Sequence, residues 1–328
     1  MRSLVILVAT FLISTTASAQ CCAGGSGSPI AGGVSQGVLQ DRQMEINTNF
    51  QTIHTDKFLE RDHSAEKTFD KYNSNYLYTR LAYGITKDFT ISVESGYYLN
   101  KTQVGLDKSD TISSKGIGDL VIFPRYDIYN HTEEETRTEI TLGMGYKIPM
   151  GSYNDSLKQV VSFTGETYYI TKPVAVQPTS GSHDFIFYAF FFRGYTEKKF
   201  RIFANALYVK KGWNPIGEKQ GNYASLGLFA GKTFFENLGV TLQLKGELIQ
   251  KMQYNSDLFL IGKYNYDVES TGSRKVLLVP QLSYTFKAFT IYALGEFPLY
   301  QYVNKLQIAS QYAFTTGLTY RFYTRKAD

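Results

Sequence analysis

The sequence lacks the features that mark a disulfide scaffold or a bundle of membrane-spanning helices. Only two of its 328 residues are cysteine, and both lie side by side at positions 21 and 22. Neither has another cysteine in the chain with which to close a long loop. After residue 19 no run approaches the roughly 20 consecutive apolar residues that a spanning helix needs, and the mean hydropathy is -0.23.

The sequence also lacks a cluster of charge of one sign. The formal net charge is +5, distributed along the chain without a basic cluster, so no nucleic-acid partner is expected.

The sequence contains no motif that predicts a cofactor. The weak candidates for a metal site are Cys21 and Cys22, whose thiolates would suit a soft ion such as Cu(I). The alternatives are free thiols on a leader or an intermolecular bridge.

We do not expect an enzyme. The chain has four histidines, and one of them lies in the run Ser182, His183, Asp184. Neighbours on a strand point to opposite faces, so these three residues cannot form a triad with one another. No catalytic residue is therefore assigned.

The one long apolar run, residues 4–13, follows Arg2 and precedes the small residues 17–19. This order is typical of a secretory signal peptide, so we assign residues 1–19 to it and expect the mature chain to begin at Gln20. In the lipoprotein alternative Cys21 carries the anchor, but the bulky Gln20 is wrong for that cleavage. Residues 20–41 are rich in glycine and either remain in the periplasm or fold into a barrel mouth as a plug.

Aromatic residues are abundant, with 26 Tyr and 23 Phe. Residues 137–148 alternate between an apolar face, which includes Ile140, Leu142 and Met144, and a face of glycines, hydroxyls and charges of both signs. Alternation with a period of two predicts a strand. A polar face of this composition suits a confined wet interior, which favours a transmembrane β-barrel over a soluble sandwich with aromatic corners, the remaining alternative.

The same pattern predicts twelve strands, each about long enough to cross a bilayer at a tilt. They are residues 43–54, 72–85, 89–99, 118–129, 137–148, 183–193, 200–210, 222–233, 238–250, 274–285, 289–300 and 311–322. The links alternate between short and long, the long ones being 55–71, 100–117, 149–182, 211–221, 251–273 and 301–310. We therefore expect one all-β domain at 42–322, a short tail at 323–328, and both termini in the periplasm.

These features place the chain in the outer membrane of a Gram-negative-type bacterium. The expected partners are outer-membrane lipid, the barrel-assembly machinery during insertion, and a small-molecule solute. If the apolar face points to lipid, the residues expected to line the lumen are Arg80, Glu94, Asp119, Arg125, Asp127, Arg137, Glu139, Lys147, Arg201, Lys245, Glu247, Glu296 and Arg321. They form either a salt-bridge network that holds the barrel in shape or a lining that selects a solute, and the two roles are compatible.

The longest link, residues 149–182, is unusually apolar for a solvated loop, with Val160, Tyr168, Tyr169 and Val176 among its members. It is expected either to pair as an extracellular hairpin or to fold back over the barrel mouth.

Short motifs at residues 115–120, 142–151, 177–184 and 298–304 resemble signatures of the outer-membrane transporter family named for the meta-pathway of phenol degradation. That family is distantly similar to the long-chain fatty acid transporters. The resemblance implies a barrel that passes small solutes, hydrophobic ones included, across the outer membrane. Met150 and the Cys21-Cys22 leader depart from the family pattern. The alternatives are a barrel that acts as an adhesin or scaffold through its loops and, third, a lipid-active barrel enzyme.

Overall fold

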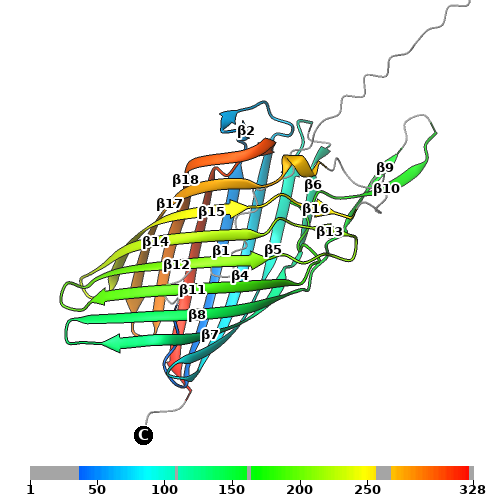
Figure 1. Cartoon of the computed structure of the whole chain (residues 1–328). Coiled ribbons are helices and arrows are strands. Elements are labelled where there is room, and N and C mark those ends of the chain that lie inside the picture. Colours follow the sequence, from blue (N-terminus) through cyan, green and yellow to red (C-terminus); the bar gives the residue numbers. More distant parts are fainter. Residues whose placement is uncertain (1–36, 108–109, 161–163, 256–266, 325–328) are drawn as a thin grey trace, which may run out of the picture.

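A computed structural model describes residues 37–107, 110–160, 164–255 and 267–324. Within them twelve long antiparallel strands form a tilted, closed barrel (Figure 1). They are β1 (Gln43–Thr55), β4 (Lys71–Thr86), β5 (Phe89–Val104), β7 (Asp119–Thr132), β8 (Thr136–Pro149), β11 (Asp184–Tyr195), β12 (Phe200–Lys210), β14 (Tyr223–Phe234), β15 (Leu238–Ile249), β17 (Ser273–Phe286), β18 (Phe289–Ile308) and β19 (Tyr312–Tyr323). The all-β, twelve-strand prediction is confirmed.

The barrel closes where the first strand meets the last. Residues of β1 pair with β19 from Gln43 opposite Tyr323 to His54 opposite Tyr312. Each remaining long strand pairs with its neighbours along the chain, so the topology is a simple up-and-down meander. Closure gives each of the twelve long strands a partner on both sides, which a β-structure in lipid requires.

The two ends of the barrel differ. Tight connections, the start of β1 and the end of β19 lie at one end, which we call the turn end; longer connections lie at the other, the loop end (Figure 1). The short elements of the loop end are β2 (Phe58–Arg61), β3 (His63–Ser64), β6 (Ile112–Ile117), β9 (Ser156–Val160), β10 (Thr167–Thr171), β13 (Glu218–Lys219), β16 (Gln253–Tyr254) and the 3-10 turn η3 (Val268–Ser270).

Parts of two predicted long links are strand instead of loop. In the link 100–117, β5 continues to Val104 and residues 112–117 form β6. Residues 301–308, expected as a loop, continue β18 and pair with β17 and β2 beyond the body of the barrel. Val303 and Ile308 are fully buried there, the latter with Phe58, Phe69 and Tyr72. Burial of these apolar side chains extends the strand, because β2 supplies a partner that the local sequence does not reveal.

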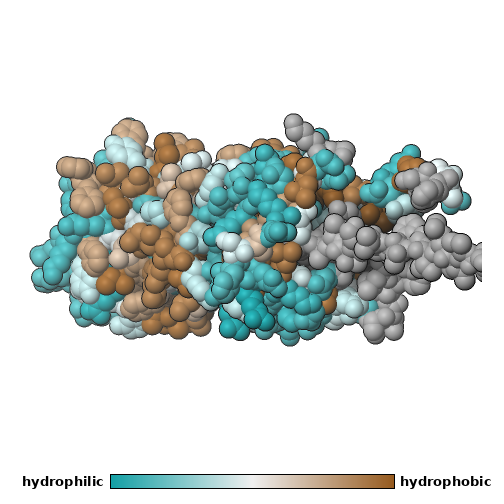
Figure 2. Space-filling view, turned by 90° about the horizontal axis from the view of Figure 1, so that it is seen from above, coloured by the Kyte–Doolittle hydropathy of each residue, from teal (hydrophilic) through white to brown (hydrophobic). Residues whose placement is uncertain are grey.

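The outer wall is apolar. Leu142 is 45% exposed on it, whereas its neighbour Thr141 is 0% exposed and faces the interior. Figure 2 shows a hydrophobic band on the visible wall with hydrophilic surface on either side. Tyr129, Phe234 and Phe286 are exposed near the turn end, as expected of an aromatic girdle. No described segment forms a helix that is long and apolar enough to cross a membrane.

Candidate functional site in the barrel lumen

One wall of the lumen is polar and is formed mainly by β1, β4, β5 and β19. Glu45 on β1 forms ion pairs with Arg80 on β4, at 2.5 Å, and with Arg321 on β19, at 2.6 Å. Glu94 on β5 accepts hydrogen bonds from Tyr78 at 2.6 Å and from Ser92 at 3.0 Å. Since every group shown here has a partner, this part of the lining is a fixed network.

A second network lies towards the loop end. Lys147 on β8 pairs with Asp119 at 3.1 Å and with Asp184 at 2.9 Å. Asp184 also pairs with Lys211 at 3.0 Å. A third network, on β15 and β18, joins Lys245 to Glu247 at 2.7 Å and to Glu296 at 3.5 Å.

Near the turn end, Asp127 accepts a hydrogen bond of 2.5 Å from Thr141, and Glu139 pairs with Arg137 at 2.9 Å. All of the charged residues expected to line the lumen are at least partly buried. Arg80, Glu94, Arg125, Asp127, Glu139, Lys147, Lys245 and Glu247 are buried, and Asp119, Arg137, Arg201, Glu296 and Arg321 are partly buried. They form several separate groups rather than a single ring.

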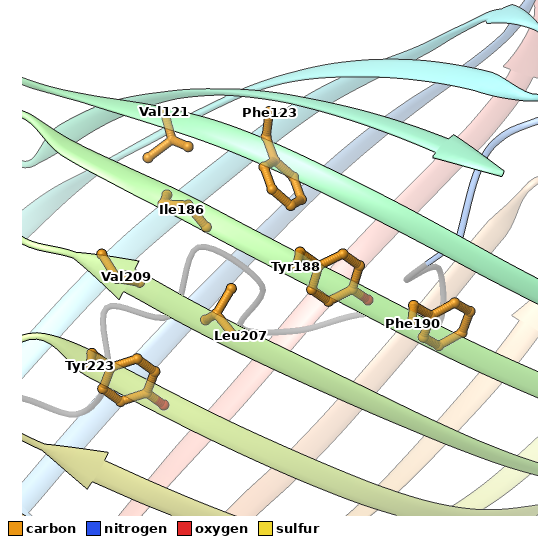
Figure 3. Packing of buried hydrophobic residues seen from close by; sticks show 8 residues of the cluster. All are labelled: Val121, Phe123, Ile186, Tyr188, Phe190, Leu207, Val209 and Tyr223. Carbon is orange, nitrogen blue, oxygen red and sulfur yellow. The ribbon is translucent and has the colours of Figure 1, made fainter. Parts of the chain in front are cut away.

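The wall opposite the polar wall is apolar. The alternation of the strands did not predict this. Figure 3 shows its residues pointing inward from β7, β11, β12 and β14: Val121, Phe123, Ile186, Tyr188, Phe190, Leu207, Val209 and Tyr223. Phe192 and Phe203 pack against this cluster, and the rings of Phe203 and Phe229 stack at 4.2 Å. The sequence does contain an indication of this wall: residues 185–192 of β11 are apolar on both faces of the strand.

Residues 173–182, which we call the strap, lie across the loop end of the lumen. Val176, Gln177 and Thr179 of the strap are buried. The strap's backbone carbonyls accept hydrogen bonds from both sides of the barrel: Tyr72 Oη to Ala175, Lys101 Nζ to Gln177, and Asn214 Nδ2 to Ser180. Donors from β4 and β5 on one side and from the β12–β14 connection on the other hold the strap in place.

The rest of the longest link forms the hairpin that was one of its two expected arrangements. β9 and β10 pair from Ser156 opposite Thr171 to Val160 opposite Thr167. Figure 1 shows this hairpin projecting beyond the loop end, and Tyr169 on it is 64% exposed. Among the described residues of this link, only the strap folds over the mouth, since the two strands of the hairpin pair only with each other. Val161 and Phe163 lie outside the described residues.

Beneath the strap is a cavity of about 230 Å³. The polar wall contributes Gln51, Tyr98 and Lys101 to its lining, the apolar wall contributes Val121, Ile186 and Val209, and the strap contributes Val174 and Pro178. Side chains of both kinds therefore face one space. Such a cavity suits a small solute that presents an apolar body and a polar group.

The described residues of the leader begin inside the turn end. The amide of Leu39, a buried residue, donates a hydrogen bond of 2.8 Å to Thr90 Oγ1. A Cβ on Gly37 would lie 1.8 Å from Glu139 Oε1, so a larger residue there would require the Glu139 carboxylate to move. Cys21, Cys22 and the rest of residues 20–36 lie outside the described part of the chain.

Ser182, His183 and Asp184 do not form a triad. Ser182 Oγ donates a hydrogen bond of 2.8 Å to Asp184 Oδ1 on the inner face. The His183 ring points to the opposite face, where its Nδ1 lies 3.0 Å from the Tyr146 hydroxyl and its ring stacks on the tyrosine. Among the described residues there is also no group of three or more metal-binding side chains of the His, Cys, Asp or Glu type.

No protein-family model matches the sequence, and no curated protein matches it. Among solved structures, the fold is similar to an outer membrane channel from Pseudomonas putida F1, at 13% identity and a TM-score of 0.65, over 89% of this chain and 99% of that one. The β-domain of the Bordetella autotransporter BrkA matches at 11% identity and a TM-score of 0.48, over 86% and 100%. The P. putida toluene transporter TodX matches at 11% and 0.43, over 88% and 92%. The first of these likenesses shows that this chain has the fold of an outer-membrane β-barrel.

Proposed function

We propose that this protein is an outer-membrane channel that passes small solutes, hydrophobic ones included, through the barrel lumen. The signal peptide and the apolar outer band support this location, with the turn end in the periplasm and the loop end outside. The observation that carries the proposal is the two-walled lumen, in which an apolar wall faces a polar one across the cavity under the strap. An apolar surface that borders a cavity, with polar groups on the other side, suits a solute that has a hydrophobic part.

The strap is the selective element in this proposal. It narrows the loop end and contributes Val174, Gln177 and Pro178 to the cavity lining. Binding at such a constriction must be favourable enough for a solute to enter and weak enough for it to leave. The fixed ion pairs keep the polar wall in one arrangement, and the apolar wall receives the hydrophobic part of the solute. The resemblance to the meta-pathway family fits a solute of this kind.

Planar-bilayer recordings test the proposal. Replacing residues 174–179 by glycine and serine at equal length removes the side chains that line the cavity and should raise single-channel conductance. Deletion of residues 156–171 is the matched control, because it removes the projecting hairpin and leaves the cavity intact, so its conductance should equal that of the wild type. If both variants fold but neither they nor the wild type conduct, the scaffold or adhesin alternative is favoured.

A further inference from the structure

Two arginines flank a glycine in one row near the turn end. On the inner face, Gly194 of β11 lies opposite Arg137 of β8 on one side and opposite Arg201 of β12 on the other. With no side chain on the residue between them, the two guanidinium groups border an open space. A cavity of about 510 Å³ lies there, lined by both arginines, Phe192 and Lys199 among others.

Arg201 is partly buried, and in the described part of the chain no carboxylate forms an ion pair with it. Within the described residues its side chain makes one hydrogen bond, a long one of 3.4 Å from Nη2 to Thr241 Oγ1. The guanidinium lies against Gly231 of β14, where a Cβ would come within 3.0 Å of Arg201 Nε. A glycine on the adjacent strand thus makes room for an arginine whose charge is not neutralised by any carboxylate of the described residues.

The neighbouring cations, unlike Arg201, have carboxylate partners. Arg137 pairs with Glu139 at 2.9 Å, and Lys199 pairs with Glu236 at 3.8 Å. Arg137 is also attracted by Asp127, so of the three cations Arg137, Lys199 and Arg201, only Arg201 lacks a carboxylate partner among the described residues. A partly buried cation without a counter-ion is costly unless an anion completes the site.

A row of phenyl rings lies directly next to the arginine row on the loop-end side. Phe192, Phe203 and Phe229 stand opposite one another on β11, β12 and β14 and face inward. They continue the apolar wall down to the arginines. A ligand that bound Arg201 through an anionic group would therefore place its body on phenyl surface rather than in water.

We propose that Arg201, with Arg137, binds the carboxylate of a small organic monoanion whose apolar, aromatic body packs on Phe192 and Phe203. The planar guanidinium suits a carboxylate, which it binds through parallel hydrogen bonds. This inference rests on the proposed function and names a solute class for the same lumen. The site is the last subsite before the turn end, and solutes leave it into the periplasm.

Calorimetry on the detergent-solubilised full mature chain tests the site with three probes: benzoate, benzyl alcohol and acetate. Benzoate has both the ring and the charge, so it should bind more tightly than benzyl alcohol, which lacks the charge, and than acetate, which lacks the ring. The variant Arg201→Gln should weaken benzoate binding at least about tenfold, since it removes a hydrogen bond to a charged group. Its binding of benzyl alcohol should be unchanged.

Arg193→Gln is the matched control. Arg193 lies on β11 next to Gly194 but is exposed on the outer wall, where its guanidinium lies over the Tyr195 ring. This variant should bind benzoate as the wild type does. Heat-modifiable migration in gels verifies that both variants fold.

The outcomes separate this inference from the proposed function. Benzoate binding that is unaffected by Arg201→Gln, or equal binding of acetate and benzoate, overturns the site even if the protein conducts. Arginine-dependent benzoate binding by a protein that does not conduct in bilayers supports the site and contradicts the channel. Absence of any benzoate binding from a conducting protein overturns the site alone.

Discussion

Arg80 on β4 and Glu45 on β1 form an ion pair of 2.5 Å between two fully enclosed side chains. Glu45 also pairs with Arg321, which lies directly opposite it on β19. One carboxylate thus joins the second long strand, the first and the last, across the seam where the barrel closes. The pairing explains why a charged group can lie inside the barrel without destabilising it.

The first prediction concerns this seam. Glu45→Gln should lower the free energy of unfolding by about 3–5 kcal/mol, because it leaves the Arg80 charge buried without its partner. Urea unfolding in detergent, followed by heat-modifiable migration, measures the loss. Glu236→Gln is the control, since Glu236 is exposed in a turn and its pair with Lys199 is worth little. Equal stability of the two variants would contradict a stabilising role for the seam.

The second prediction concerns the face that meets lipid. Leu142 points outward at the middle of β8, so Leu142→Arg should cost about 2–4 kcal/mol of folding free energy. Met150 is also exposed but follows the end of β8, near the membrane edge, so Met150→Arg should cost about 0–1 kcal/mol. Refolding yield into lipid vesicles compares them. A similar loss for both residues would show that the apolar band is placed wrongly.

The third prediction tests whether the strap is held by close packing. Gly181 has a φ of 70°, and a Cβ there would lie 2.4 Å from the Tyr153 ring. Gly165 has almost the same φ, 71°, with nothing within 4 Å of the added atom. Both alanine variants bear similar backbone strain, on the order of 1 kcal/mol, but Gly181→Ala should also displace the strap. Single-channel recordings should show a larger or noisier current for Gly181→Ala alone; indistinguishable traces would mean that the strap does not limit conduction.

The fourth prediction concerns the mature N-terminus. Because Gln20 is unsuitable before a lipidated cysteine, the protein isolated from membranes should begin at Gln20 and carry no acyl chain. Intact-mass spectrometry of the purified protein decides this. A mass that includes a diacylglyceryl group on Cys21 would establish the lipoprotein alternative instead.

Much of the barrel can be predicted from the sequence because strand alternation is a local signal. In β8, Thr141 and Leu142 point to opposite faces, as their residue types indicate. The same rule identifies the charged residues of the inner face, including Arg80 and Glu94. Their partners cannot be predicted in this way, since each pair depends on register between strands that are distant in the sequence.

The apolar wall was missed, whereas folding over the barrel mouth was one of the two arrangements expected for the link that contains the strap. The rule that apolar residues face lipid fails for β11, where Phe187 faces outward and Tyr188 inward, because the lumen itself has an apolar side. The strap could not be distinguished by sequence from the rest of this link as the part that folds over the mouth. It is buried because Lys101, 76 residues from Gln177, supplies a hydrogen bond to its backbone, and no local pattern encodes that contact.

Liposome swelling tests the central claim, that the lumen is a path for small solutes, most directly. Vesicles that contain the wild-type protein should swell in an isotonic solution of a small neutral solute, faster than protein-free vesicles. Vesicles with the variant in which glycine and serine replace residues 174–179 should swell faster still. If both proteins are folded and neither raises the swelling rate above that of protein-free vesicles, the lumen is closed and the channel account is wrong.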